Sequence, residues 1–202
     1  MNISLSDAGK RFNRDWIFRH VSFEFLPLGT YAITGPNGSG KSTLLQVIGG
    51  AMLHSEGVIK YSNDQSADIK EPYQYIAIAA PYLELIEELT AIEFLSFHEG
   101  FKPLTHTIPQ ILASVNLENA ASKQIRYYSS GMKQRLKLAQ AFFSAAPVLL
   151  LDEPTSNLDR EGTELYKQLI KSQVGNRMII VSSNVEEEYA FCEKVVRIED
   201  YK

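Results

Sequence analysis

The sequence has one cysteine, and it lacks both a leader segment and a long apolar run. A single cysteine cannot form an internal disulfide, so we expect a reducing compartment, with Cys192 as a small hydrophobic packing residue. The first seven residues lack the basic start and apolar stretch of a signal peptide. The most apolar window, 138–151, is interrupted by Gln140, Ser144 and Pro147 and falls short of the roughly 20 residues that cross a bilayer. These absences predict a soluble chain that would reach a membrane only through a partner.

Basic residues are also few. The 202 residues include 20 Lys and Arg against 24 Asp and Glu, which gives a net charge of −4 and a pI near 5.6. Nucleic-acid binding usually requires clustered Lys and Arg and a high pI, so no nucleic-acid partner is expected. A hydrophobic fraction of 45% and a charged fraction of 22% are ordinary for globular proteins. The length suits one well-buried domain.

The N-terminal part alternates between apolar and polar residues. Residues 21–25 have the period of two that is typical of a strand with one solvated face. Together with a strand at 2–5 they predict an antiparallel β subdomain, with a loop around 9–15. The apolar run 31–34 predicts a buried strand, and 41–48 predicts a helix that stops at the glycine pair after it.

Residues 82–145 have a helical pattern. Thr90 and Glu93 have the spacing of a capping box, which opens the first of three expected helices. The other two are expected at 108–115 and 130–145, the last with an apolar face at three- and four-residue intervals. This stretch predicts a helical subdomain inserted into the rest of the chain.

Strands and helices alternate after this insertion, which implies a mostly parallel sheet with helices on both faces. The fold class is therefore α/β, a single domain of residues 1–202 whose core (1–81 and 146–202) is interrupted by 82–145. The expected elements are strands at 148–151, 178–181 and 195–198 and helices at 161–173 and 186–193.

A phosphate-binding loop follows the predicted strand at 31–34. Its residues fit the pattern G-x-x-x-x-G-K-[ST] between a strand and a helix, which is the context that this motif requires. Glycines let the backbone N–H groups surround a polyphosphate, and the helix start adds partial positive charge. Lys41 would reach the β- and γ-phosphates, and the Ser42 hydroxyl would bind Mg²⁺. The motif is Gly35-Pro36-Asn37-Gly38-Ser39-Gly40-Lys41-Ser42.

Two carboxylates end the predicted strand 148–151. Ligands of open α/β sheets bind at the carboxyl ends of strands, so Asp152 and Glu153 are expected beside the phosphate loop. Asp152 would hold Mg²⁺, through water. Glu153 would act as the general base on the attacking water, an effect that is typically worth about 10²–10⁴ in rate.

Two further motifs make the chain resemble the ABC ATPase family. The stretch 128–135 resembles the family's signature motif, and residues 156–159, after Leu151-Asp152-Glu153-Pro154-Thr155, resemble its D-loop with Asp159. The resemblance covers nearly the whole chain with the motifs in the family's order, and it implies a P-loop NTPase core. The signature stretch is Tyr128-Ser129-Ser130-Gly131-Met132-Lys133-Gln134-Arg135.

The resemblance implies a nucleotide-binding subunit that hydrolyses MgATP and drives separate integral-membrane subunits. It also implies a cytoplasmic location, on the inner face of the membrane through that partner. ATP would be closed between the phosphate loop of one copy and the signature of another, in a head-to-tail homodimer or heterodimer. The expected ATP contacts are Phe12, Gly35, Pro36, Asn37, Gly38, Ser39, Gly40, Lys41, Ser42 and Thr43 in one copy and Ser129, Ser130, Gly131 and Met132 in the other.

Three positions keep alternatives open or depart from the family's pattern. Phe12 stands where the family places an aromatic residue on adenine, with Trp16 as its competitor and plain packing as a third interpretation. Ser130 replaces the first signature glycine, a change compatible with a helix-capping role. The family places a metal-binding glutamine after a strand that is expected here at 75–79. No residue is assigned to this role, because residues 80–82 are Ala-Pro-Tyr and Gln74 precedes that strand.

Asn184 stands at the family's switch histidine, after the strand 178–181. It can donate a hydrogen bond but cannot accept a proton, so slow hydrolysis is expected. Two rival functions stay open. One is a soluble ABC ATPase that acts on nucleic acid or the ribosome, although no tandem cassette, coiled coil or basic extension is visible. The other is a weakly hydrolysing regulatory cassette.

Overall fold

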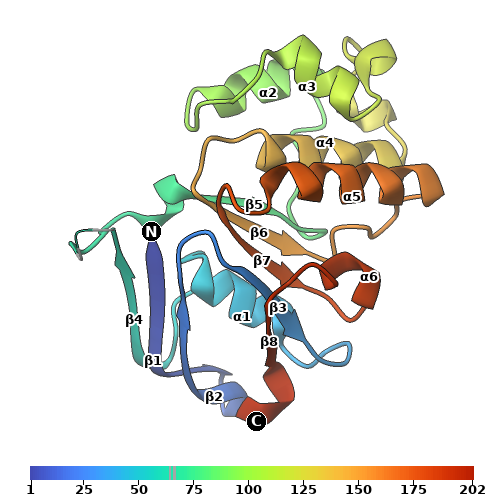
Figure 1. Ribbon diagram of the computed structural model, residues 1–202. Coiled ribbons are helices and arrows are strands. Elements are labelled where there is room, and N and C mark those ends of the chain that lie inside the picture. Colours follow the sequence, from blue (N-terminus) through green and yellow to red (C-terminus); the bar gives the residue numbers. More distant parts are fainter. Residues whose placement is uncertain (64, 66) are drawn as a thin grey trace.

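The computed structural model describes residues 1–202 except 64 and 66, and its described part contains two sheets (Figure 1). The smaller sheet is antiparallel, in the order β2-β1-β4. Its strands are β1 (Asn2–Phe12), β2 (Asp15–Phe25) and β4 (Glu56–Ser62). The predicted N-terminal antiparallel subdomain is confirmed, and β4 is a strand that the sequence patterns did not reveal.

The predicted loop around residues 9–15 is too long. β1 and β2 stay paired up to Phe12 and Asp15, and the chain reverses within the two residues between them. Asn13 takes a left-handed backbone with φ of 54°, which asparagine tolerates well. Register shifts along β1 interrupt the alternation of its side chains, so the period of two does not appear in this part of the sequence.

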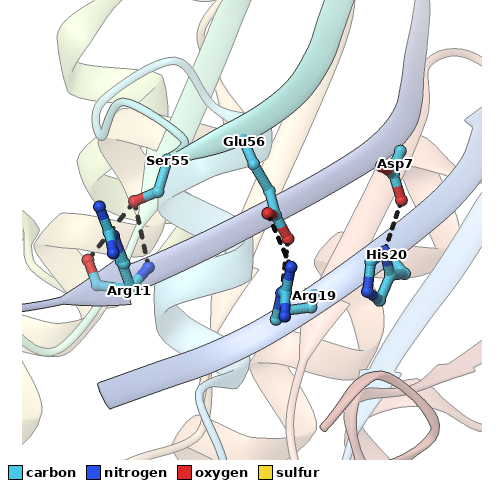
Figure 2. Close-up of polar contacts among 6 residues, drawn as sticks. All are labelled: Asp7, Arg11, Arg19, His20, Ser55 and Glu56. Carbon is cyan, nitrogen blue, oxygen red and sulfur yellow. Dashed lines mark hydrogen bonds and ion pairs between the residues drawn. The ribbon is translucent and has the colours of Figure 1, made fainter. Parts of the chain in front are cut away.

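An ion pair spans the antiparallel sheet from one edge to the other. Arg19 on β2 donates two hydrogen bonds, of 2.8 and 3.0 Å, to the Glu56 carboxylate on β4 (Figure 2). A Cβ atom on Gly9 of the central strand would lie 2.6 Å from that carboxylate, so the bridge needs a glycine beneath it. The hydrogen bond from Arg19 lowers the pKa of Glu56. The bridge and the glycine together fix the register of the three strands.

The larger sheet is parallel throughout its described pairings, in the order β5-β6-β7-β3-β8. Side chains of β5, β6 and β7 alternate between two cores. Leu149 and Leu151 of β6 pack with the helices α2 to α5, whereas Val148 and Leu150 pack with α1 and the antiparallel sheet. The strands are β3 (Thr30–Thr34), β5 (Ile76–Ala79), β6 (Val148–Asp152), β7 (Met178–Ser182) and β8 (Lys194–Arg197).

Helices cover both faces of the parallel sheet, with α4 and α5 on one face and α1 on the other (Figure 1). The capping box of Thr90 and Glu93 opens α2 as predicted. The helices are α1 (Lys41–Ile48), α2 (Ala91–Glu99), α3 (Ile108–Ser114), α4 (Ser130–Phe142), α5 (Arg160–Gln173) and α6 (Glu186–Tyr189). Single 3₁₀ turns are η1 (Pro72–Tyr75), η2 (Glu118–Ala120), η3 (Ile125–Tyr127) and η4 (Ile198–Tyr201).

Two predicted helices end early. α4 stops at Phe142 because the buried Arg177 side chain donates to carbonyl oxygens there, at 2.7 Å to Phe142 and 3.1 Å to Ser144. α6 stops at Tyr189, where the Cys192 N–H closes a turn on the Tyr189 carbonyl at 2.8 Å. Cys192 packs against the core, and burial raises the pKa of its thiol to about 12, as suits a small hydrophobic residue. No helix in the described part of the chain is both long and apolar enough to span a membrane.

Candidate nucleotide-binding and catalytic site

The phosphate loop connects the buried strand β3 to α1. Gly40 caps the helix with φ of 100°, a left-handed conformation that disfavours other residues. A Cβ atom on Gly40 would lie 2.3 Å from the Ile17 side chain, and one on Gly35 would lie 2.6 Å from Ile198. Glycine is therefore required at both positions by close packing as well as by backbone angle.

A cavity opens over this loop, and most of the predicted phosphate ligands line it. Gly35, Pro36 and Ser39 shape the loop without lining the cavity. Ile17 of β2 is a lining residue that the sequence patterns did not single out. The lining residues are Ile17, Asn37, Gly38, Gly40, Lys41, Ser42, Thr43 and Glu153.

The Lys41 side chain lies within the loop and is only 4% exposed. Its ammonium donates to the carbonyl oxygens of Gly35 at 3.0 Å and Pro36 at 3.1 Å. These bonds hold a positive charge where the loop's glycines leave room for an anion. The arrangement suits the β- and γ-phosphates of a nucleotide.

Asp152 is the last residue of β6 and Glu153 follows it, next to the end of β7. Asp152 is 1% exposed, and its Oδ1 atom has no hydrogen-bond partner among the described residues. A buried carboxylate oxygen without a partner suits a Mg²⁺ ion, which Asp152 and Ser42 would hold together with phosphate oxygens and water. Bound there, the ion would neutralise phosphate charge.

Glu153 has a left-handed backbone, with φ of 41°, and its N–H donates to the Ser182 carbonyl at 2.9 Å. Such a conformation costs a non-glycine residue of order 1–3 kcal/mol, and it is found most often at functional sites. The bend turns the side chain from the strand direction into the lining of the cavity. The Glu153 carboxylate group therefore belongs to the same cavity as the phosphate loop.

Asn184 lies after the end of β7, beside the phosphate loop, although it does not line the cavity. The Ser183 N–H donates to the Ile33 carbonyl at 3.1 Å, which fixes this turn against β3. The Asn184 side-chain amide then donates to the Asn37 side-chain oxygen at 3.1 Å. The amide at the switch position is therefore hydrogen-bonded to a side chain of the phosphate loop.

The signature residues line a second cavity. The helix cap there is Ser129, whose hydroxyl accepts from the Met132 N–H at 3.2 Å, so the capping role considered for Ser130 is wrong. Ser130 is instead the first residue of α4. This cavity shares no lining residue with the phosphate-loop cavity. It is lined by Ser129, Ser130, Gly131, Met132, Arg135, Asn157 and Asp159.

Side chains of α4 connect the signature to the segment after Glu153. The buried Gln134 amide donates to the Pro154 carbonyl at 2.9 Å. Arg135 donates to Asp159 at 3.2 Å. Asp159 caps α5 by accepting from Gly162, and this bond is the main cause that lowers the pKa of Asp159. The two cavities are thereby linked through one short segment.

Two further side chains support the site and were missed by the sequence patterns. The buried Glu188 carboxylate accepts from the Thr155 N–H at 2.9 Å and from the Thr155 hydroxyl, which anchors the segment after Glu153 to α6. Tyr82, where the glutamine is missing, has its pKa raised first by burial and then by the charge of Asp152, and a hydrogen bond with Gln46 opposes that rise. The Tyr82 phenol is thus within electrostatic reach of Asp152.

Neither candidate adenine-stacking residue lines the phosphate-loop cavity. Trp16 has two cationic neighbours, since the guanidinium groups of Arg19 and Arg11 lie 4.2 and 5.5 Å from its ring centroid. Phe12, at the hairpin turn, is 45% exposed, with Lys10 5.0 Å from its ring centroid. Phe12 thus has the more accessible ring.

Comparisons with known proteins agree with this geometry. The sequence profile of the family described as "ABC transporter" matches residues 18–156. The ABC transporter ATP-binding protein YybJ of Bacillus subtilis is 29% identical over 196 residues, covering 95% of this chain and 89% of its own. The cytochrome c biogenesis ATP-binding export protein CcmA of Xylella fastidiosa is 34% identical over 157 residues, covering 76% and 70%.

A solved structure shows the same fold. It is a dimer of the ATP-binding cassette MJ0796 in a post-hydrolysis state bound to ADP and Pi, with a TM-score of 0.80 at 24% identity over 97% of this chain and 94% of that one. The P-loop fold class is thereby confirmed. The chain belongs to the ABC transporter family, as one of its ATP-binding cassettes.

Proposed function

We propose that this chain hydrolyses MgATP between two head-to-tail copies and thereby drives an integral-membrane transporter subunit. The observation that carries the proposal is the separation of the two cavities. The phosphate loop and Glu153 line one cavity, whereas the signature residues line another with no residue in common. A signature that is to touch bound ATP must therefore come from a second cassette.

Within this proposal the site residues take the following roles. The loop and Lys41 bind the β- and γ-phosphates, Ser42 and Asp152 hold Mg²⁺, and Glu153 takes a proton from the attacking water. The Ser129 hydroxyl and the first N–H groups of α4 from the second copy would hold the γ-phosphate. Phe12 is the candidate for stacking on adenine.

A groove beside α4 supports docking to a membrane partner. It lies between α4 and the segment that follows β5, and it combines acidic, basic and apolar side chains. Within this proposal the chain is peripheral, held on the cytoplasmic face of the membrane by its partner. The groove is lined by Pro81, Leu83, Glu84, Leu85, Glu87, Lys133 and Lys137.

Reversing a charge in this groove is expected to release the partner. Tagged wild-type chain, purified from native membranes in mild detergent, should carry a membrane subunit that mass spectrometry identifies. Glu84→Lys should lose most of that subunit, because it reverses the charge of an exposed groove residue. Glu99→Lys, an equal reversal at an exposed residue of α2, should retain it. Recovery of ribosomes or nucleic acid instead of a membrane protein would favour the soluble alternative.

Slow hydrolysis is proposed from Asn184. Its amide is bonded to Asn37, and an asparagine cannot carry the positive charge of an imidazolium. Asn184→His should raise the single-turnover rate by about 10²-fold, which is what one well-placed donor is typically worth. Affinity for MgATP should stay within about twofold. The measurement is rapid-quench hydrolysis with enzyme in excess.

The neighbouring Val185→His is the matched control, since Val185 is exposed and its apolar side chain cannot make the hydrogen bond to Asn37 that Asn184 makes. It should leave the rate unchanged. Equal rates for wild type and Asn184→His would mean that this position does not limit the chemistry. No hydrolysis in either protein would support the regulatory-cassette alternative.

A further inference from the structure

The segment after β8 returns to the phosphate loop. The turn η4 packs beside β2, close to the point marked C in Figure 1. Ile198, at its start, is fully buried and contacts Gly35, the first residue of the loop. The loop is therefore supported from behind by residues that are about 160 positions away in the sequence.

Lys202 makes the most direct contact of this segment with the loop. Its ammonium donates to the Ser39 carbonyl oxygen at 2.6 Å and to the Ile17 carbonyl oxygen at 2.8 Å. Ser39 belongs to the phosphate loop and is buried, and Ile17 lines the cavity. Hydrogen bonds from an ammonium are roughly twice as strong as those between neutral groups. Lys202 thus ties the loop to the strand that forms the wall of the cavity.

Holding the Ser39 carbonyl also orients a phosphate donor. The carbonyl of Ser39 and the N–H of Gly40 belong to one planar trans peptide, so the two groups point in opposite directions. Attraction of the carbonyl to Lys202 directs the Gly40 N–H away from Lys202. Gly40 lines the cavity, and as a glycine its backbone has little intrinsic preference that would hold this peptide in place. An external anchor supplies the missing restraint.

We propose that Lys202 is a positioning residue for the phosphate loop, which it holds in the shape that binds the polyphosphate of MgATP. The inference rests on the proposed function of the loop as an MgATP site. Lys202 makes no contact with the nucleotide in this scheme. It affects nucleotide binding indirectly, by fixing the orientation of the peptide between Ser39 and Gly40.

The test replaces the ammonium and compares two ligands. Lys202→Met should weaken MgATP binding about tenfold, the effect expected from losing charge-assisted hydrogen bonds. It should weaken the binding of inorganic tripolyphosphate equally, because the Gly40 N–H is expected to contact the phosphates and not the adenine base. Calorimetry measures ATP, and displacement of a fluorescent ATP analogue measures tripolyphosphate. Lys202→Arg should recover most of the affinity, since a guanidinium can donate to both carbonyls.

Lys194→Met is the matched control, because it removes the same charge from an exposed residue of β8, the strand before this segment, and it should bind like wild type. Unchanged affinity in Lys202→Met would overturn the proposal. So would a loss for ATP without a loss for tripolyphosphate, because the effect would then lie outside the phosphate-binding peptide. A wild type that binds neither ligand would overturn the proposed function together with this inference. If Lys202→Met does not fold, Lys202→Gln replaces it in the test. The affinities of Lys202→Gln for both ligands should lie between those of wild type and those expected for Lys202→Met.

Discussion

Replacement of Lys41 by alanine is expected to abolish measurable MgATP binding while the chain stays folded. The Lys41 ammonium is the positive charge inside the loop, and it is held there by two loop carbonyls. Its removal leaves the β- and γ-phosphates with backbone donors alone. Loss of a buried charge-assisted contact on a multiply charged ligand should raise the Kd at least about 10²-fold. Titration calorimetry measures the affinity directly.

Lys123→Ala is the control for Lys41, because Lys123 is an exposed lysine outside the phosphate-loop cavity. It should bind MgATP like wild type. Circular dichroism and thermal unfolding without nucleotide should show both variants folded, since the parallel sheet does not depend on the loop's charge. Wild-type affinity in Lys41→Ala would contradict the assignment of this cavity to the phosphates.

Glu153→Gln is expected to convert the chain into a dimer that persists in MgATP. Glutamine keeps the shape and hydrogen bonding of glutamate but cannot take the proton of the attacking water. Hydrolysis should fall by about 10²–10⁴, the usual contribution of a general base. ATP then stays between the two copies and holds them together. Sedimentation with and without MgATP measures the change from monomer to dimer.

A second substitution separates the ATP sandwich from other modes of dimerisation. A Cβ atom on Gly131 would already lie 3.2 Å from the Asn157 carbonyl, so an acidic side chain there should block the signature cavity and repel the γ-phosphate. The double variant Glu153→Gln with Gly131→Asp should stay monomeric in MgATP and still bind ATP. A dimer that survives Gly131→Asp would place the contact elsewhere. A single variant that never dimerises would contradict the sandwich for the isolated chain.

The sequence predicts those parts of the fold and site that are local along the chain. The phosphate loop, the pair Asp152–Glu153 and the capping box at Thr90 each depend on residues within a few positions of one another. α1 accordingly has the predicted bounds, and the strands of the parallel sheet lie within a residue of the expected ones. Such patterns remain visible because one strand or helix turn determines them.

Residues brought together by tertiary folding are not visible in this way. Arg177 ends α4 from a different element, and the charge of Lys202 reaches the loop only after the chain has folded back. Nothing near Glu188 in the sequence indicates that its carboxylate is buried against Thr155. β4 was missed for a related reason, because its side chains are mostly exposed or half-buried and carry no clear alternation.

The left-handed backbone at Glu153 means that the residue proposed as the general base also lowers the stability of the fold. At φ of 41°, glycine would relax the main chain, yet glycine would remove the carboxylate that the cavity needs. Variants selected only for resistance to heat should therefore tend to lose this side chain, because relief of local strain is a common route to stabilisation. Two contacts hold Glu153 in this conformation. Its N–H donates to the Ser182 carbonyl, and the Glu188 carboxylate accepts from the Thr155 N–H, which anchors the segment that follows Glu153. Substitutions intended to raise the thermostability of this cassette should therefore be placed in the antiparallel sheet and not at the end of β6.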